Sequence, residues 1–426
     1  MSKDKKYSKV VPELRFSEFE GEWQEAILEK FLIRKPEYGI NAPAVPYSDK
    51  LPTYLRITDI STDGYYLKDK RVSVAKEVTE DNYLNEGDIV FARTGASVGK
   101  SYKYNITDGR LVFAGFLIRI KPNEKKISSE LLFQFLSTEQ YWRWVKFSSA
   151  RSGQPGINGK QYASMPITLP PTLPEQQKIA NTLTNLDDLI GAENEKLDAL
   201  KAHKKGLLQQ LFPAKGEKVP GLRFGEFEGA WEEKLVDDFF DVGSSKRVLQ
   251  KDWTNKGIPF YRTRELVSLS KSEPFGSEIF ISEELFSELS KKYGVPEIGD
   301  FLVSGVGTLG ISYQVKAGDK FYFKDGNVIW FKTGKDIVPD YFNFCFQSQH
   351  YQKQIFGQSS ASTVGTYTIT NAKKTKFWKP PTKDEQQKIA DCLSSLDDSI
   401  TAQSEKIEAL QAHKKGLMQQ LFPNIK

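Results

Sequence analysis

Two stretches of the chain place apolar residues at alternating steps of four and three, the spacing of a coiled-coil seam. They cover residues 175–211 and 385–421, and each predicts one long helix. The Thr-x-x-Glu sequences that begin at Thr172 and Thr382 match a capping box, and Pro213 and Pro423 follow as stop signals. The predicted seam consists of Ile179, Leu183, Leu186, Ile190, Leu197, Leu200, Leu207 and Leu211 in the first helix, and of Ile389, Leu393, Leu396, Ile400, Ile407, Leu410, Leu417 and Leu421 in the second.

Polar residues interrupt both seams at equivalent places. Glu193 and Lys204 occupy seam positions of the first helix, and Gln403 and Lys414 occupy those of the second. In a full-length antiparallel pair, Glu193 would meet Gln403 near the middle, where a buried polar pair fixes the register at some cost in stability. The alternative is that all four side chains extend into solvent.

Two further features recur inside the predicted helices. Gly206 and Gly416 each cost about 1 kcal/mol in a helix interior, which predicts a close approach by a neighbour or a local break in both helices. The acid pairs at 187–188 and 397–398 occupy adjacent positions and do not converge on one point, so we expect them on a solvated helix face.

The segments outside these helices predict a different kind of structure. Each half contains short runs rich in β-branched and aromatic residues and bounded by Gly, Asp and Asn, which is typical of strands and hairpins. The runs are 53–61, 87–95 and 110–120 in the first half and 258–266, 299–307 and 321–331 in the second; a helical patch follows at 128–146 and at 338–354. We therefore expect an α+β protein in which each half carries a domain dominated by a curved mixed β-sheet.

The chain is duplicated internally. PELRFSEFEGEW at 12–23 returns as PGLRFGEFEGAW at 220–231 with nine of twelve positions identical, and 175–213 returns as 385–423 with 27 identities in 39. An offset near 210 exceeds the period of solenoid repeats and indicates a domain duplication with pseudo-twofold symmetry. The segments between the repeats diverge, which suggests two domains tuned to different targets. The expected boundaries are 1–172, 173–213, 214–381 and 382–426, for domain, helix, domain and helix.

Composition narrows the class of protein. The chain has 426 residues, 39% hydrophobic and 12% aromatic, which favours at least two soluble globular domains. Cys345 and Cys392 form no CxxC pattern, and three histidines form no zinc cluster. No apolar run of about 18 residues occurs, so we expect a cytoplasmic protein with no membrane segment. The net charge of +5 permits nucleic-acid binding without requiring it.

Two glycine loops resemble phosphate-binding motifs. Residues 305–310 match GxGxxG, and residues 95–101 resemble a Walker loop that is one residue too short. Both are followed by strand-like sequence instead of the helix that a phosphate site requires. They also occupy the same place in the two halves, so a shared hairpin loop is the better interpretation. No methyltransferase, nuclease or nucleophile–base motif is evident.

Four repeated signals together resemble the specificity subunit of Type I restriction–modification systems. They are the LRFxEFEGxW segment, a GDI or GDF strand with its glycine loop, a PPxxxEQQKIA junction and the AHKKGLxQQLFP helix end. The resemblance covers essentially the whole chain. The two glycine loops differ from each other, ARTGASVGK at 92–100 and VSGVGTLGIS at 303–312.

The resemblance implies a non-catalytic subunit that reads double-stranded DNA. Each target-recognition domain would read one part of a split site, and the two helices would pair antiparallel and set the spacing. Two modification subunits, which methylate adenine, and two ATP-dependent restriction subunits are the implied partners. No cofactor is expected in this chain; S-adenosylmethionine, ATP and magnesium belong to those partners.

A DNA reader needs cations for phosphates and planar donors for base edges. On this basis we expect DNA contacts from Arg56, Arg93, Thr94, Lys100, Lys103, Arg151, Gln154 and Lys160 in the first domain, and from Lys246, Arg247, Arg262, Arg264, Gln358, Ser359, Lys373 and Lys374 in the second. A helix of 37 residues is roughly 55 Å long, against about 34–36 Å for one DNA turn, so two domains on such a rod could meet one face of a duplex.

Three alternatives stay open. The helices could form a plain interdomain coiled coil with no role in measuring distance. The chain could be an adaptor that holds two ligand-binding domains and shows no salt-dependent affinity for duplex DNA. It could also be an enzyme that binds a nucleotide at its glycine loops, which requires a helix after Gly310.

Overall fold

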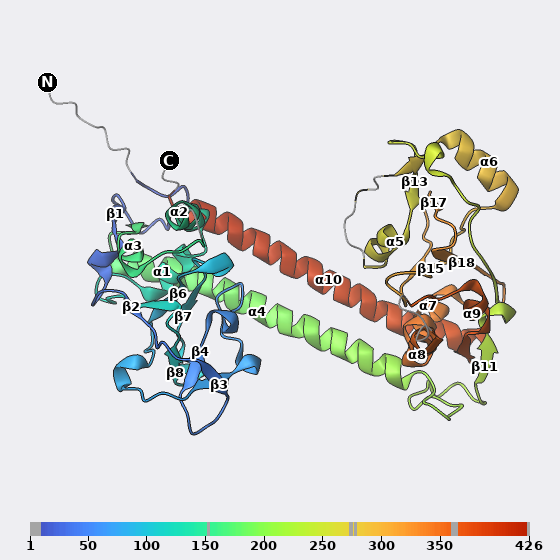
Figure 1. Cartoon of the computed structure of the whole chain (residues 1–426), viewed down its shortest axis with the longest axis horizontal. Coiled ribbons are helices and arrows are strands. Elements are labelled where there is room, and N and C mark those ends of the chain that lie inside the picture. Colours follow the sequence, from blue (N-terminus) through green and yellow to red (C-terminus); the bar gives the residue numbers. More distant parts are fainter. Residues whose placement is uncertain (1–9, 151–153, 272–275, 277–278, 359–364, 424–426) are drawn as a thin grey trace. The chain divides into compact units, whose positions relative to one another are not determined.

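The computed structural model describes residues 10–150, 154–271, 276, 279–358 and 365–423. The chain forms two compact units, one of residues 1–194 and 405–426 and the other of residues 195–404. Helices α4 (Leu173–Gln210) and α10 (Lys383–Leu421) each contribute to both units. Each unit therefore combines one variable globular segment with a portion of each repeated helix (Figure 1).

The globular part of the first unit contains three sheets. Strand β1 (Gln24–Ile27) pairs with β10 (Pro166–Leu169), and two four-stranded sheets have the orders β2-β9-β6-β7 and β3-β5-β4-β8. Their strands are β2 (Glu37–Tyr38), β3 (Ala44–Pro46), β4 (Thr53–Leu55), β5 (Val72–Val74), β6 (Ile89–Ala92), β7 (Ser101–Lys103), β8 (Leu111–Phe113) and β9 (Leu117–Ile120). The helices are α1 (Ser129–Phe135), α2 (Glu139–Ser149) and α3 (Gly159–Ala163). Strands β4 and β8 are parallel and the other pairs are antiparallel, so this part is α+β with a mixed sheet.

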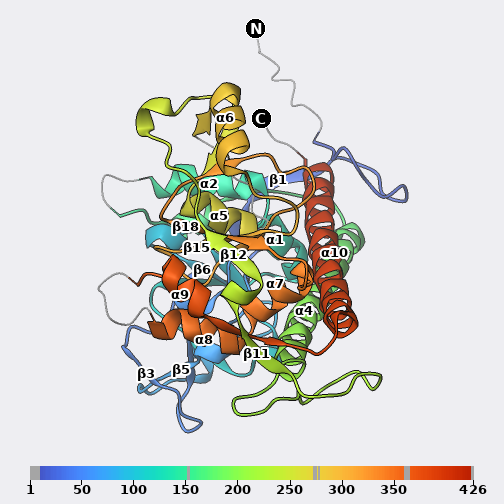
Figure 2. The same ribbon diagram turned by 90° about the vertical axis from the view of Figure 1, so that its right-hand side faces the viewer.

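The second unit repeats this topology. Strand β11 (Glu232–Leu235) pairs with β19 (Lys376–Lys379), a four-stranded sheet has the order β12-β18-β15-β16, and β14-β13-β17 form a smaller sheet. Their strands are β12 (Phe240–Gly243), β13 (Ile258–Tyr261), β14 (Phe280–Ile281), β15 (Phe301–Ser304), β16 (Ser312–Gln314), β17 (Tyr322–Phe323) and β18 (Val328–Thr333). The helices are α5 (Thr263–Ser270), α6 (Glu283–Tyr293), α7 (Pro339–Gln347), α8 (Gln349–Gln358) and α9 (Ile369–Lys374). Helix α9 packs against β12, both labelled in Figure 2, and α8 packs against β19.

Most predicted elements are present, with one correction. Strands lie within all six predicted runs, and helices cover both predicted patches. However, the run at 258–266 ends as a strand at Tyr261, and α5 begins two residues later. The physical reason is a capping box: the Glu265 carboxylate accepts from the backbone N–H of Arg262, and Leu266 is buried on the helix face toward the sheet.

The core of each unit includes the ends of both long helices. In the first unit, Ile179 and Leu183 near the start of α4 share a cluster with Leu421 at the end of α10. In the second unit, Leu211 near the end of the first helix shares a cluster with Ile389 and Leu393 near the start of α10. The start of one helix therefore packs with the end of the other in both units, which confirms antiparallel pairing.

The predicted seam faces inward. Its members Ile179, Leu183, Leu197, Leu211, Ile389, Leu393, Ile407 and Leu421 are buried, and the others are half-buried. The two seam lysines do not simply extend into solvent. Lys414 pairs with Asp187 in the first unit, and Lys204 pairs with Asp397 at 2.6 Å in the second.

Two expectations about the helices need correction. Asp188 and Asp398 are exposed as expected, but Asp187 and Asp397 each pair across the seam with a lysine of the opposite helix. Gly206 and Gly416 mark neither a close approach nor a break. Both lie within continuous helix, and a Cβ added at either position would meet nothing within 4 Å.

The repeated LRFxEFEGxW segment closes over the start of a helix in each unit. In the first, Arg15 pairs with Glu175 at 2.7 Å and Trp23 donates to the same carboxylate. In the second, Arg223 pairs with Glu385 at 2.7 Å and Trp231 donates to that carboxylate at 3.1 Å. We call each set an arginine–glutamate clasp.

Only half of the predicted capping box forms at each helix start. The Thr172 and Thr382 hydroxyls accept from the backbone N–H of Glu175 and Glu385, at 3.4 and 3.2 Å. The carboxylates of Glu175 and Glu385 accept hydrogen bonds from the arginine and tryptophan of the clasp instead of from the threonine backbone N–H. No described helix has both the length and the apolar character needed to cross a membrane.

Candidate nucleic-acid interface

Several candidate DNA-contacting residues are held by nearby acids. Arg56 pairs with the buried Asp59 at 2.7 Å, and Arg262 pairs with the buried Glu265 at 2.6 Å, in both cases three residues further on. Arg264 also approaches Glu265, at 3.0 Å, although 62% of its side chain is exposed. These arginines hold the turn that follows β4 or β13 together, which limits their freedom to meet a phosphate.

The remaining candidates also fall into two groups, those held by a nearby partner and those that are exposed. Lys103 pairs with Glu130 at 2.7 Å, Lys373 pairs with Asp237 at 2.8 Å, and Lys100 donates to the backbone oxygen of Ile60 at 2.8 Å. In contrast, Lys160 of the first domain and Lys246, Arg247 and Lys374 of the second are exposed. Arg151, Ser359 and the side chain of Gln358 lie outside the described residues.

Four candidates of the first domain come together at one end of the central sheet. Strand β6 leads directly into Arg93 and Thr94, and an isolated β-bridge joins Thr94 to Gly156. The backbone N–H of Ile157 donates to the Arg93 oxygen at 2.9 Å. This pairing places the exposed Gln154 and Lys160 beside the segment that carries Arg93 and Thr94.

Two aromatic residues missed by the sequence analysis complete this site. The Arg93 guanidinium carbon lies 4.9 Å from the ring centroid of Tyr38, within cation–π range. The Tyr38 hydroxyl accepts from the backbone N–H of Gly159 at 3.0 Å, which fixes the ring. Phe116, whose backbone oxygen accepts from the Arg93 N–H, is 62% exposed. We call Arg93, Tyr38, Phe116, Gln154 and Lys160 the stacked-arginine site.

The same end of the second domain carries a cavity of about 400 Å³. Hydroxyl, glycine and aliphatic residues line it: Ser244, Gly305, Val306, Gly326, Val328, Ile329, Thr366, Tyr367, Thr368, Ile369 and Thr370. None of these residues is charged at neutral pH. The exposed Lys246 and Arg247 lie two and three residues after Ser244 in the chain. We call this the hydroxyl-lined cavity.

The repeated Gly-Asp pair before each central strand is structural. Asp88 is buried, accepts from the backbone N–H of Asn85 at 3.0 Å and lies 3.5 Å from Arg119; burial raises the pKa of its carboxyl. Asp300 is also buried and accepts from the Trp330 indole at 2.8 Å. Both carboxylates thus organise the sheet from inside the domain.

The glycine loops are hairpins. The loop after β6 contains a single 3-10 turn (Gly95–Ser97) and leads into β7, and the loop after β15 leads into β16, so no α-helix begins at either loop. Gly99 and Gly310 both have positive φ, at 87° and 76°. The loops resemble phosphate-binding motifs because a tight turn also requires glycine at such positions.

Replacing Gly99 by alanine should therefore lower the stability of the first unit and leave nucleotide binding absent. A Cβ there would approach Val145 Cγ1 to 2.6 Å in a backbone conformation unfavourable for alanine. We expect a loss of about 1–3 kcal/mol in the free energy of unfolding, measured in urea. Gly109→Ala is the matched control, because it has a similar φ of 79° and open space around it. An equal loss in both variants would contradict the packing explanation.

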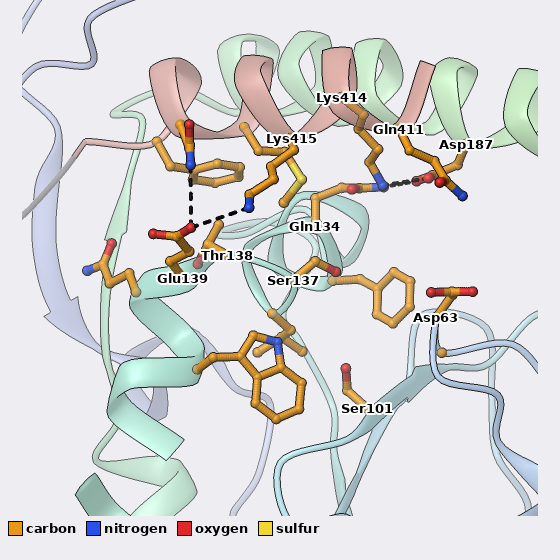
Figure 3. A pocket seen from close by; sticks show the side chains of 18 of the residues that line it. Asp63, Ser101, Gln134, Ser137, Thr138, Glu139, Asp187, Gln411, Lys414 and Lys415 are labelled. Carbon is orange, nitrogen blue, oxygen red and sulfur yellow. Dashed lines mark hydrogen bonds and ion pairs between the residues drawn. The ribbon is translucent and has the colours of Figure 1, made fainter. Parts of the chain in front are cut away.

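A larger hollow, of about 1000 Å³, lies in the first unit between α2 and the helix pair. Figure 3 shows Lys414 directed at Asp187 and Lys415 directed at Glu139 across its upper wall. Trp142, 44% exposed, also lines it. Its lining mixes acids, bases and exposed aromatic surface, so its composition fits a protein surface better than a phosphate backbone.

Comparisons with known proteins agree with this architecture. Residues 50–202 and 228–412 match the model of the Type I restriction modification DNA specificity domain. The type I restriction enzyme MjaVIII specificity subunit of Methanocaldococcus jannaschii is 24% identical over 394 residues, which cover 89% of this chain and 88% of that protein.

Solved structures share the fold. The crystal structure of the Type I restriction-modification system S subunit from M. genitalium has a TM-score of 0.59 at 13% identity, covering 97% of this chain and 100% of the other. A chain from a study of complex assembly and conformational transition of the type I R-M system has a TM-score of 0.56 at 14% identity, covering 94% and 98%. Since the two family matches together span well over half of the sequence, this chain belongs to the family of Type I restriction modification DNA specificity proteins.

Proposed function

We propose that this chain is the DNA-reading subunit of a Type I restriction–modification complex and that each of its two domains reads one part of a split site. The observation that carries the proposal is the repetition of one topology in two units whose equivalent surfaces differ in chemistry. A duplication that served only as a scaffold has no need for an arginine stacked on tyrosine in one domain and a neutral cavity in the other.

The repeated helices would set the distance between the two domains and hold the partner subunits. Most of their seam positions are apolar, and the lysine–aspartate pairs Lys414–Asp187 and Lys204–Asp397 recur at matched positions in the two units. In the proposed complex, two modification subunits bind S-adenosylmethionine and methylate adenine, and two restriction subunits join through them. The hollow beside α2 is the surface of the first unit that we assign to a modification subunit, because Trp142 offers an aromatic anchor there.

The direct test is to purify the chain with its modification partner and to map methylated adenines on DNA of random sequence. A consensus of two specified segments separated by unspecified bases is expected. An uninterrupted consensus, or methylation without sequence preference, would refute the proposal.

Charge removal at the second domain tests where DNA lies. Lys246→Ala combined with Arg247→Ala should weaken binding of the complex to every DNA sequence. It should also reduce the slope of log affinity against log salt by up to about 2, because each phosphate contact releases about 0.9 counterion. The control is Lys316→Ala combined with Lys335→Ala, two exposed lysines beyond the opposite end of the same sheet. Equal salt slopes for the two double variants would place the DNA elsewhere on this domain.

A further inference from the structure

Arg93 and Gly305 occupy equivalent positions in the two domains. Ile89 and Phe301 each follow a Gly-Asp pair and begin the central strands β6 and β15. Arg93 and Gly305 each lie four residues further on. The backbone oxygen of each accepts a hydrogen bond of 2.9 Å, from Ile157 in the first domain and from Tyr367 in the second.

The neighbouring positions correspond as well. The residue after Arg93 bridges to Gly156, and the residue after Gly305 bridges to Thr366. In the first domain, Tyr38 of β2 pairs with Ile118 of β9. Ile118 also pairs with Phe91, the residue before the last one of β6. Ser244 comes one step beyond the last β12–β18 pair, and its hydroxyl donates to the Val328 oxygen at 3.0 Å. Tyr38 and Ser244 therefore lie at the same place on the two sheets.

The two domains carry side chains of different chemistry at these two positions. In the first, a guanidinium and a phenol ring fill the space. In the second, glycine and serine replace them and line the hydroxyl-lined cavity. A Cβ at Gly305 would lie only 2.9 Å from the Tyr367 backbone oxygen, so the backbone of this domain leaves no room for an arginine at that position. The contrast is local, because the strands, the bridges and the hydrogen bonds around it are conserved between the two domains.

Arg93 is built to present a planar donor. Among the described residues no carboxylate pairs with it, unlike Arg56 and Arg262; its guanidinium makes one long hydrogen bond there, 3.5 Å, from Nη1 to the Gly115 oxygen. The Tyr38 ring, held by Gly159, restricts the guanidinium to one plane. A planar fork of N–H donors matches the N7 and O6 acceptors of guanine in the major groove.

The cavity offers the opposite chemistry. Val306, Val328, Ile329 and Ile369 supply aliphatic wall, and the remaining polar groups are neutral hydroxyls and backbone. None of its described lining residues carries the positive charge that would favour guanine. The one apolar group that a base displays in the major groove is the 5-methyl group of thymine. A neutral cavity with aliphatic walls fits the methyl-bearing edge of that base.

We propose that this shared position determines specificity in both half-sites: the Arg93–Tyr38 stack selects guanine in the first, and the hydroxyl-lined cavity selects thymine in the second. The proposal rests on the function proposed above and names one base in each half-site. It attributes the difference in base preference at this position to two side chains on strands of equivalent register.

The first arm of the test uses Arg93→Ala and Arg93→Lys in the complete complex with its modification partner, scored by methylation of a randomised DNA library. The lysine variant keeps the charge and loses the planar fork. Both variants should lose guanine preference at one position of the first half-site by about 5–150-fold, the range that corresponds to one bidentate contact. Every position of the second half-site should be unchanged.

The second arm fills the cavity from two walls, with Ser244→Tyr and Thr370→Phe. Thr370 is exposed on α9, so the phenylalanine adds bulk to the cavity without disturbing buried packing. Each variant should lose thymine preference at one position of the second half-site only. Ser287→Phe on α6 is the control, since it adds the same bulk at an exposed position of the same unit that does not line the cavity.

The outcomes separate the inference from the proposed function. If the unmodified complex yields no split consensus, the proposed function fails. If it yields one and the variants leave that consensus unchanged, or change a position other than guanine or thymine, the inference alone is overturned. Circular dichroism of each variant establishes that an altered consensus comes from a folded chain.

Discussion

Replacing Glu385 by alanine is expected to lower the free energy of unfolding of the second unit by about 3–5 kcal/mol, the usual cost of removing one partner of a buried ion pair. The Glu385 carboxylate is 1% exposed and is the paired anion of Arg223, which is itself only 13% exposed. Its removal also takes the acceptor from the Trp231 indole. An arginine without its counterion would then remain inside the junction between the sheet domain and the helix.

Urea unfolding combined with amide hydrogen exchange measures this loss and locates it. Amides of β15 and β18 report on the second unit, and amides of β6 and β9 serve as an internal reference in the first. Asp398→Ala, at an exposed position of the same helix within the second unit, should change stability by no more than about 0.5 kcal/mol. Were Glu385→Ala to match this control, the clasp would be no more than a surface ion pair.

The clasp gives a structural reason why two segments that are far apart in sequence are the most similar ones between the two halves of the chain. The LRFxEFEGxW segment and the EQQKIA helix start lie about 160 residues apart in each half, yet arginine and tryptophan of the first meet glutamate of the second. The divergent sheets lie between them in the chain. Each sheet domain is thus attached to its helix by a constant joint, while its outer end remains free to change.

Regular periodicity made the helices and strands predictable. The four–three spacing of Leu183 or Leu393 requires only that one helix face be buried, and burial follows from the sequence itself. The continuity of the helices at Gly206 and Gly416 was not predictable, because a packed helix tolerates the cost of about 1 kcal/mol for an isolated glycine without any visible compensation.

The candidate site was predictable only in part, because its chemistry depends on partners distant in sequence. Arg56, Arg93 and Arg262 follow or end strands in similar contexts, and only the structure shows that Arg93 has no acid beside it. One local signal was present: Arg56 and Arg262 each precede an acid by three residues, the spacing of a capped turn. Tyr38 gave no such signal, since its contact with Arg93 spans two strands that are far apart in the chain.

Reversing the charge of Asp187 with lysine is expected to destabilise the first unit by about 2–4 kcal/mol, somewhat less than the loss of a fully buried pair. Asp187 and its partner Lys414 are 20% and 17% exposed, and Gln134 also donates to the Asp187 carboxylate at 2.9 Å. Two lysines would then face each other across the apolar seam. Adding Lys414→Asp restores opposite charges with the sites exchanged.

The exchanged pair distinguishes pairing of the helices from a local effect at residue 187. If the ion pair itself joins α4 to α10 in this unit, the double variant should recover at least half of the lost stability in urea unfolding, measured as the coupling in a double-mutant cycle. Additive losses would show that Gln134 and the surrounding hollow, not the ion pair, account for the effect.

Lys204 and Asp397 provide the same double-mutant cycle in the second unit, where the pair is 2.6 Å long and Asp397 is more exposed, at 44%. A smaller coupling is expected there, because solvent screens the more exposed carboxylate. The ranking of the two cycles therefore tests whether burial sets the strength of the helix pairing.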